Sequence, residues 1–136
     1  MTTGSLWKEK YRIGIEKLDQ EHMAMCARMS DLVRALEEDN ARTAVDSLLG
    51  RFYDQLKQHL HDEENHLADV KCPDLDVHAQ EHRAVLKTFE KTFEKWEMWL
   101  DSPGGDQVLI DLGNWLLAEL LTSDVRMRDY LVGYKE

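Results

Sequence analysis

Side chains that can bind metal interrupt the apolar face of several stretches with helical spacing. They are His22, His59, Glu63, His78, His82, Glu119 and Asp124. His59 and Glu63 are four residues apart, as are His78 and His82, so each pair would lie on one face of a helix, one turn apart. Imidazole and carboxylate together suit cations such as iron, manganese or zinc, whereas a structural zinc site more often uses thiolates.

Burying all of these groups without a partner would be prohibitive. A polar group without a partner costs roughly 2–7 kcal/mol in apolar surroundings, and an ionised carboxylate costs far more. The net stability of a domain is only about 5–15 kcal/mol. Seven side chains also exceed what one ion takes, since tetrahedral zinc needs about four ligands and an octahedral ion about six. The pattern therefore indicates two cations bridged by carboxylates.

Four amphipathic segments would position these side chains. Apolar residues recur at spacings of three and four over about 16–38, 42–66, 74–100 and 106–132, after an irregular arm over about 1–15. Pro73 and the run "DSPGGD" interrupt the chain on either side of the third segment. Long helices with short connections predict an all-α protein, an antiparallel up-down-up-down four-helix bundle that forms a single domain over residues 1–136.

Charge and composition exclude several classes of partner. The 136 residues carry a net charge of −10, which repels phosphate backbones and anionic lipids, so neither nucleic acid nor membrane insertion is expected. No apolar run approaches the length of a bilayer span and the N-terminus lacks the apolar block of a signal peptide, so we expect a cytoplasmic protein. Cys26 and Cys72 are expected as free thiols, the first in the core and the second in a loop.

The ordered motifs resemble those of the hemerythrins, and specifically of the single-domain bacterial hemerythrins. They are Trp7 in the arm, "GIEKLDQEH" ending at His22, "HLHDEE" from His59, "HAQEH" from His78 to His82, and "WLLAELLTSD" ending at Asp124. The resemblance covers nearly the whole chain. It implies a non-haem diiron centre in a four-helix bundle that binds dioxygen at one iron, as an oxygen carrier, store or sensor rather than an enzyme.

The resemblance also implies a role for each motif residue. His22 and His59 would be terminal ligands of the iron that keeps an open position, and His78 and His82 would be terminal ligands of the other iron. Glu63 and Asp124 would bridge the two ions, with an oxo or hydroxo group as third bridge. The expected ligands of the open position are dioxygen or small anions.

Several further residues can be placed in the core or at the surface, and the resemblance adds a role at the site for some of them. Apolar residues near the ligands belong to the core by default and would also wall the oxygen pocket; they are Met25, Leu60, Trp115, Leu116 and Leu120. His61 and His66 match no ligand of the family and are expected at the surface. Glu64 is expected around the site or in solvent. We expect the domain to be a monomer or a small homo-oligomer, either as a separate protein or as part of a larger signalling protein.

One position departs from the family pattern W-L-x-x-H-I-x-x-x-D. Glu119 stands where the histidine belongs, and we interpret it as an oxygen ligand of the iron held by His78 and His82. Two alternatives are a side chain that swings to solvent, leaving that iron four- or five-coordinate, and an engineered substitution. Asp124 lies about 140° around an ideal helix from Glu119, so both can face inward only if the helix widens locally, as in a π-bulge.

The glutamate at position 119, in place of the family's histidine, also suggests alternative functions. A carboxylate in place of a neutral imidazole adds negative charge, which favours the more oxidised metal and makes the diferrous state harder to keep. The main alternative to reversible oxygen binding is therefore a diiron oxidase or peroxidase activity. A third is a bundle whose metal site is partly lost.

Overall fold

The computed structural model describes residues 7–38 and 42–133, and every regular element within these ranges is helical. The elements are η1 (Glu9–Tyr11), α1 (Glu16–Glu38), α2 (Arg42–Asp69), α3 (Leu75–Glu94), α4 (Trp96–Leu100), α5 (Gly105–Val125) and α6 (Arg128–Gly133). The expected all-α class is confirmed. Residues 1–6 of the expected arm lie outside the described residues. Nowhere in the described ranges is a helix both long enough and apolar enough to cross a bilayer.

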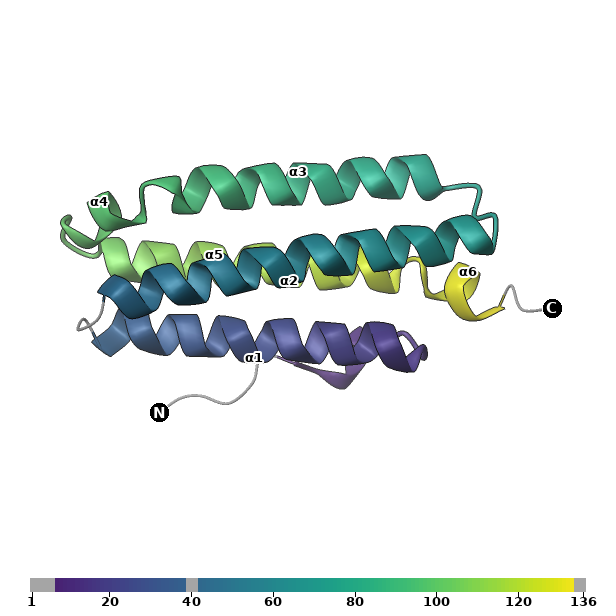
Figure 1. The fold of residues 1–136 in the computed structure, drawn as a ribbon, viewed down its shortest axis with the longest axis horizontal. Helices are drawn as coiled ribbons and strands as arrows, with labels where there is room; N and C mark the ends of the chain where they lie inside the picture. The colour runs from purple at the N-terminus through teal and green to yellow at the C-terminus, as the bar shows by residue number, and fades with distance from the viewer. Residues whose placement is uncertain (1–6, 39–41, 134–136) are drawn as a thin grey trace.

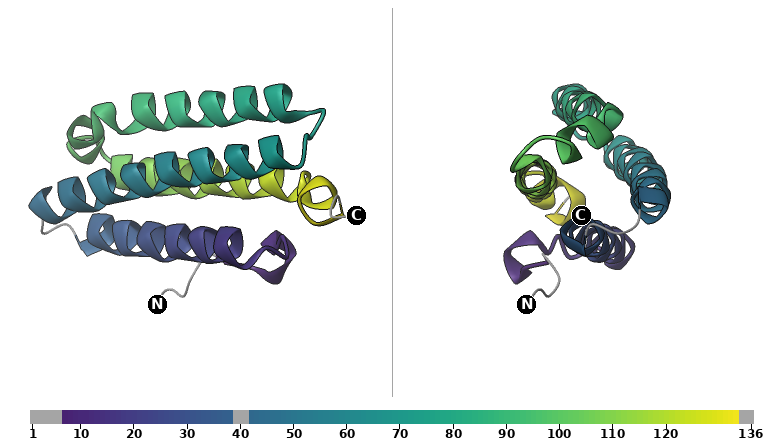
Figure 2. Two further views of the ribbon diagram at one scale, coloured as in Figure 1. Left: turned by 45° about the vertical axis from the view of Figure 1, so that its right-hand side comes forward. Right: turned by 90° about the vertical axis from the view of Figure 1, so that its left-hand side faces the viewer.

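The four longest helices, α1, α2, α3 and α5, lie side by side with their axes roughly aligned (Figure 1). Helix α1 packs against α2, α2 against α3, α3 against α5, and α5 against α1. Seen from the end, they surround a common centre (Figure 2). The inward faces of all four helices therefore meet, and side chains far apart in the sequence come together there.

The third and fourth helical segments are both divided, in contrast to the single helices expected. Helix α3 ends at Glu94, because Lys95 has φ −118° and ψ 40°, outside the helical region, and α4 begins at the next residue. The break accompanies burial of Trp96, whose indole N–H donates to Asp46 at 3.0 Å. The last segment divides after Val125, and α6 begins at Arg128. Apolar spacing continues across both breaks, so periodicity alone did not predict them.

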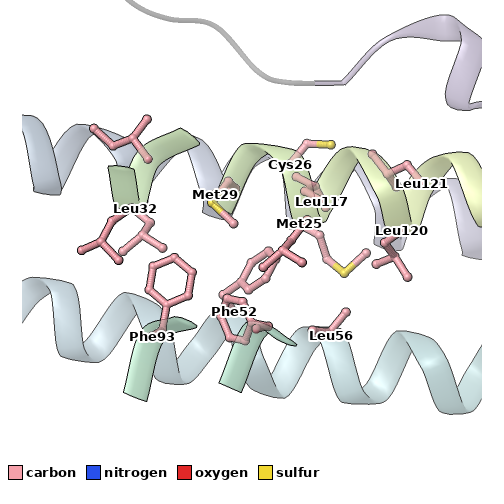
Figure 3. Packing of buried hydrophobic residues seen from close by; sticks show 14 of the residues in the cluster. Met25, Cys26, Met29, Leu32, Phe52, Leu56, Phe93, Leu117, Leu120 and Leu121 are labelled. Atoms are coloured by element: carbon pink, nitrogen blue, oxygen red, sulfur yellow. The ribbon is translucent and has the colours of Figure 1, made fainter. Parts of the chain in front are cut away.

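Two apolar clusters fill the interior, one on each side of a polar layer. The larger cluster includes Met25, Cys26, Met29, Leu32, Phe52, Leu56, Phe93, Leu117, Leu120 and Leu121 (Figure 3). The smaller one consists of Ile13, Leu18, Leu67, Cys72 and Leu131. Along α1, His22 lies between Leu18 of the smaller cluster and Met25 of the larger one. The candidate ligands are thus enclosed by apolar side chains in both directions along the helices.

The segment before α1 is tied to that helix by a buried carboxylate. Asp19 is 3% exposed, and its two oxygens accept the backbone N–H groups of Ile13 at 2.7 Å and Gly14 at 2.9 Å. Gly14 has φ 103°, a conformation that side chains with a Cβ rarely adopt. These contacts fix the chain entering α1 about one turn before His22.

Candidate metal centre

Six of the seven predicted ligand residues meet in the middle of the structure. Each of their side chains is at most 1% exposed; they are His22 on α1, His59 and Glu63 on α2, His78 and His82 on α3, and Asp124 on α5. The four-residue spacings place both members of each pair on the inward face, as the sequence analysis expected. Their donor atoms form two groups that share the two carboxylates, and within each group the atoms lie within 4.8 Å of one another.

The first group, here the His22–His59 half-site, is built from three helices, α1, α2 and α5. The Nε2 atoms of His22 and His59 are 2.9 Å apart, and each lies 2.9 Å from Oδ2 of Asp124. Oε2 of Glu63 lies 3.9 Å from Nε2 of His59. Two imidazole nitrogens and one oxygen from each carboxylate therefore point to the same place.

The second group, the His78–His82 half-site, uses the other oxygen of each carboxylate. Oε1 of Glu63 lies 2.6 Å from Nε2 of His78 and 3.1 Å from Nε2 of His82. Oδ1 of Asp124 lies 3.1 Å and 2.8 Å from the same two nitrogens. Glu63 and Asp124 thus each present one oxygen to each half-site, which is the arrangement of a bridging carboxylate.

Three of the four imidazoles are held from behind through their Nδ1 atoms. Nδ1 of His59 donates to Glu21 at 2.7 Å, and Nδ1 of His82 donates to Glu64 at 2.8 Å. A proton on Nδ1 leaves the lone pair on Nε2, which is the atom that faces the other ligands. The imidazoles are therefore oriented as metal ligands.

Two residues, Ser123 and Glu81, contact the third imidazole, that of His78. Nδ1 of His78 lies 3.3 Å from the hydroxyl of Ser123, which donates to Oε1 of Glu81 at 2.6 Å, and that oxygen lies 3.4 Å from the same nitrogen. Nδ1 of His22, by contrast, has no hydrogen-bond partner within residues 7–38 and 42–133. Glu21, Glu81 and Ser123 were not predicted from the sequence. A signal was present, because "QEH" occurs twice, at 20–22 and at 80–82.

The electrostatics of the cluster fit a bound cation. Burial alone lowers the pKa of His59, but hydrogen bonds with Asp124 and Glu21 outweigh it and raise the pKa to about 10. Burial is likewise outweighed by hydrogen bonds with Asp124 and Glu63 at His78, whose pKa rises to about 9, and at His82, whose pKa rises to about 12. The buried carboxylates thus attract positive charge onto their neighbours.

The two buried carboxylates, Glu63 and Asp124, also require positive charge or hydrogen-bond donors beside them. Burial raises the pKa of Asp124, yet the hydrogen bonds from the four imidazoles bring it well below its usual value. Oε2 of Glu63 is buried and has no hydrogen-bond partner among the described residues. Lone pairs of nitrogen and oxygen converge where water has no access, so the donor set suits metal ions better than protons alone.

The predicted inward position of Glu119 is wrong. Its side chain is exposed, and it is not among the residues whose donor atoms converge. Helix α5 is a regular α-helix from Gly105 to Val125, without the expected π-bulge, so turning Asp124 inward turns Glu119 outward. Apolar residues surround most of this helix, and the inward face proves to be that of Leu109, Gly113, Leu117 and Asp124 rather than that of Trp115.

The residues expected to wall an oxygen pocket divide in the same way. Met25, Leu60, Leu116 and Leu120 are at most 7% exposed. Leu116 and Leu120 help to line a small apolar cavity of about 10 Å³, enough for one water-sized sphere. Trp115, by contrast, is 56% exposed and lies outside this wall.

The remaining histidines and the cysteines stand apart from the donor atoms that converge. His61 is exposed and His66 is half-buried. Cys26 and Cys72 are both free and buried, and Cys72 lies in the loop between α2 and α3, as predicted. Burial raises the pKa of Cys26 to about 12, which keeps it a neutral thiol.

Comparison with known proteins gives the family. A family model described as the hemerythrin HHE cation binding domain matches residues 13–126. Bacteriohemerythrin from Clostridium acetobutylicum is 25% identical over an alignment of 131 residues that covers 93% of this chain and 98% of that relative. No solved structure gives a significant match. The matched range contains all six converging side chains, and the chain belongs to the hemerythrin family of HHE cation-binding domains.

Proposed function

We propose that the chain is a single hemerythrin-type domain whose up-down-up-down bundle holds two iron ions and binds dioxygen. The main support for this proposal is the way the carboxylate oxygens are shared between the two half-sites. Glu63 and Asp124 each turn one oxygen to the His22–His59 half-site and the other to the His78–His82 half-site. One metal would leave half of these buried donor atoms without a partner.

The ligand set selects the class of metal. Each half-site offers two imidazole nitrogens and two carboxylate oxygens, and neither Cys26 nor Cys72 belongs to it. Nitrogen and oxygen donors of this kind suit iron. A bound diferrous pair would supply electrons and an open coordination position for dioxygen. The surrounding apolar side chains, including Leu116 and Leu120, would keep water and protons away from that position.

A second candidate, a diiron oxidase or peroxidase, is favoured by one observation. Because Glu119 stands where the family pattern has histidine and faces outward, the His78–His82 half-site has two imidazoles among the described residues, the same number as the His22–His59 half-site. Both ions would then have fewer protein ligands than the six of an octahedral site. A second open position would give dioxygen or peroxide a place to react instead of leaving.

Optical absorption separates these functions. The purified chain is loaded with ferrous iron without oxygen, then exposed to dioxygen, and then placed under vacuum. Reversible binding predicts a charge-transfer band that appears and then disappears. A band that decays irreversibly, with turnover of an added reductant, supports the oxidase or peroxidase. Well under two irons per chain and no band would contradict both.

A further inference from the structure

The outer face between α3 and α5 carries a groove of about 300 Å³, close to the lower end of the size range of small-molecule sites. These two helices are neighbours in the bundle (Figure 2). The groove contains Trp115 and Glu119, the two residues that were predicted to face inward and are exposed in the structure. Neither takes part in the metal cluster, so their exposure needs a separate explanation.

The groove has an apolar floor and an aromatic wall. Val85 and Leu116 line it together with Trp115, which is 56% exposed. A large exposed indole beside aliphatic side chains can cover the apolar body of a small ligand. The face of an indole also attracts cations through its quadrupole, more strongly than that of any other side chain. An apolar molecule with a positive charge would use both properties.

The charges on the groove point to the same class of ligand. Glu81, Glu119 and Arg126 line it. Arg126 lies 3.9 Å from Oε2 of Glu81, so these two charges offset each other. Glu119 makes no hydrogen bond or ion pair with any described residue, and it stands one helical turn from Trp115. The groove therefore carries one uncompensated carboxylate beside an exposed aromatic ring.

The groove also touches the metal cluster. Ser123, another lining residue, contacts Nδ1 of His78 through its hydroxyl and donates the hydrogen of that hydroxyl to Glu81. Only one side chain thus separates a molecule in the groove from a candidate iron ligand. Leu116 lines both this groove and the internal cavity.

We propose that the groove between α3 and α5 binds a small organic cation, a protonated amine on an aromatic or aliphatic body. The apolar body lies against Trp115, Val85 and Leu116, and the ammonium group lies beside Glu119. This inference goes beyond the proposed function and does not depend on it, because none of these four side chains is a candidate metal ligand.

The test compares two ligands of similar shape and opposite charge. Phenethylammonium and 3-phenylpropionate are titrated separately into the iron-loaded and the metal-free chain, with tryptophan fluorescence as the readout. The ammonium compound should give a saturable change and bind at least about tenfold more tightly than the carboxylate. The Trp115→Phe variant should lose most of the fluorescence change, which assigns the signal to the groove.

Matched variants locate the charge. Glu119→Gln should weaken phenethylammonium binding roughly two- to fivefold. Glu37→Gln, which removes the same charge from an exposed position on α1, should leave binding unchanged. Circular dichroism checks that the variants fold. Equal affinity for the two ligands, an unaffected Glu119→Gln variant, or no saturable binding would each overturn the proposal. Iron content and dioxygen response are measured separately, so a failure here is distinguishable from a failure of the proposed function.

Discussion

His22 and His59 come from two different helices, whereas His78 and His82 stand one turn apart on α3. The distance between the first two histidines therefore depends on how α1 packs against α2. The distance between the second two is largely set by the geometry of one helix. The His22–His59 half-site can change shape when the bundle shifts, and the His78–His82 half-site is the more rigid of the two.

The hydrogen-bond partners of the Nδ1 atoms also make the His78–His82 half-site the more firmly held of the two. Both histidines of the His78–His82 half-site have Nδ1 partners, whereas Nδ1 of His22 has none among the described residues. The hydrogen bond from His82 lowers the pKa of Glu64, while burial raises the pKa of Glu21 behind His59. Better-oriented and more basic imidazoles bind metal more tightly. We expect the His78–His82 half-site to fill first and to release iron last.

The largest effect should come from the residue that both half-sites share. Asp124→Asn removes the charge and one metal-facing oxygen while keeping the size of the side chain. Iron affinity should fall by more than about 100-fold in both half-sites, beyond what loss of an outer partner costs. Iron per chain after gel filtration measures this, with Glu63→Gln as a second test of a bridging residue. Loss of iron from only one half-site would show that Asp124 is not shared.

Removing one terminal histidine should separate the half-sites. His22→Ala and His82→Ala should each retain about one iron per chain, because the opposite half-site keeps its own imidazoles. The remaining iron should leave more slowly to a chelator in His22→Ala, where the His78–His82 half-site is intact. Faster release from that variant than from His82→Ala would mean that the His22–His59 half-site holds iron more firmly.

A smaller effect is expected from the outer carboxylates. Glu64→Gln should weaken iron binding about 10- to 100-fold in the His78–His82 half-site, because His82 loses the acceptor that orients it. Glu21→Gln should have a weaker effect on the other half-site, since burial makes this carboxyl harder to ionise. Competition with a calibrated chelator measures both affinities. Equal losses would mean that the outer partners do not distinguish the half-sites.

The stability of the metal-free chain should fall as pH rises above neutrality. The pKa values of His59, His78 and His82 are raised to about 10, 9 and 12 from an ordinary value of 6.5. Their contribution to the free energy of unfolding is full below about pH 6.5 and is lost as pH rises through the folded values. Iron bound by these imidazoles would replace the protons and would bind more tightly as pH rises.

Thermal unfolding of both forms tests this linkage. The difference in Tm between the iron-loaded and metal-free chains should widen between about pH 6.5 and pH 9. A difference that stays constant or narrows over this range would contradict the assignment of protons to these imidazoles.

The smallest effect is expected at Glu119. Glu119→Gln should change neither the iron content nor the optical spectrum, because the side chain is exposed on the outer face of α5. Loss of iron from the His78–His82 half-site in this variant would restore Glu119 as a ligand. It would also remove the equality in ligand number between the half-sites.

Helical periodicity predicted the inward placement of the four-residue pairs because spacing along one helix is independent of its neighbours. His59 with Glu63 and His78 with His82 needed no knowledge of packing. Periodicity failed on α5, where apolar residues surround most of the helix and do not specify which side faces the core. Contacts with the other helices decide it, and they turn Asp124 inward.

The features that the sequence did not predict depend on tertiary structure. Glu21 precedes His22 in the sequence but binds His59 on another helix, and Ser123 binds His78 across the α3–α5 interface. The break at Lys95 depends on local backbone angles and on burial of Trp96, which apolar spacing does not report. Such contacts become visible only when the helices are placed together.

The most direct test of the account is an anomalous difference map, recorded at the iron edge from crystals grown with iron under anaerobic conditions. We predict two peaks, one between His22 and His59 and the other between His78 and His82, with Glu63 and Asp124 contacting both. A single peak, or iron bound only at surface carboxylates such as Glu119, would contradict the two-cation centre.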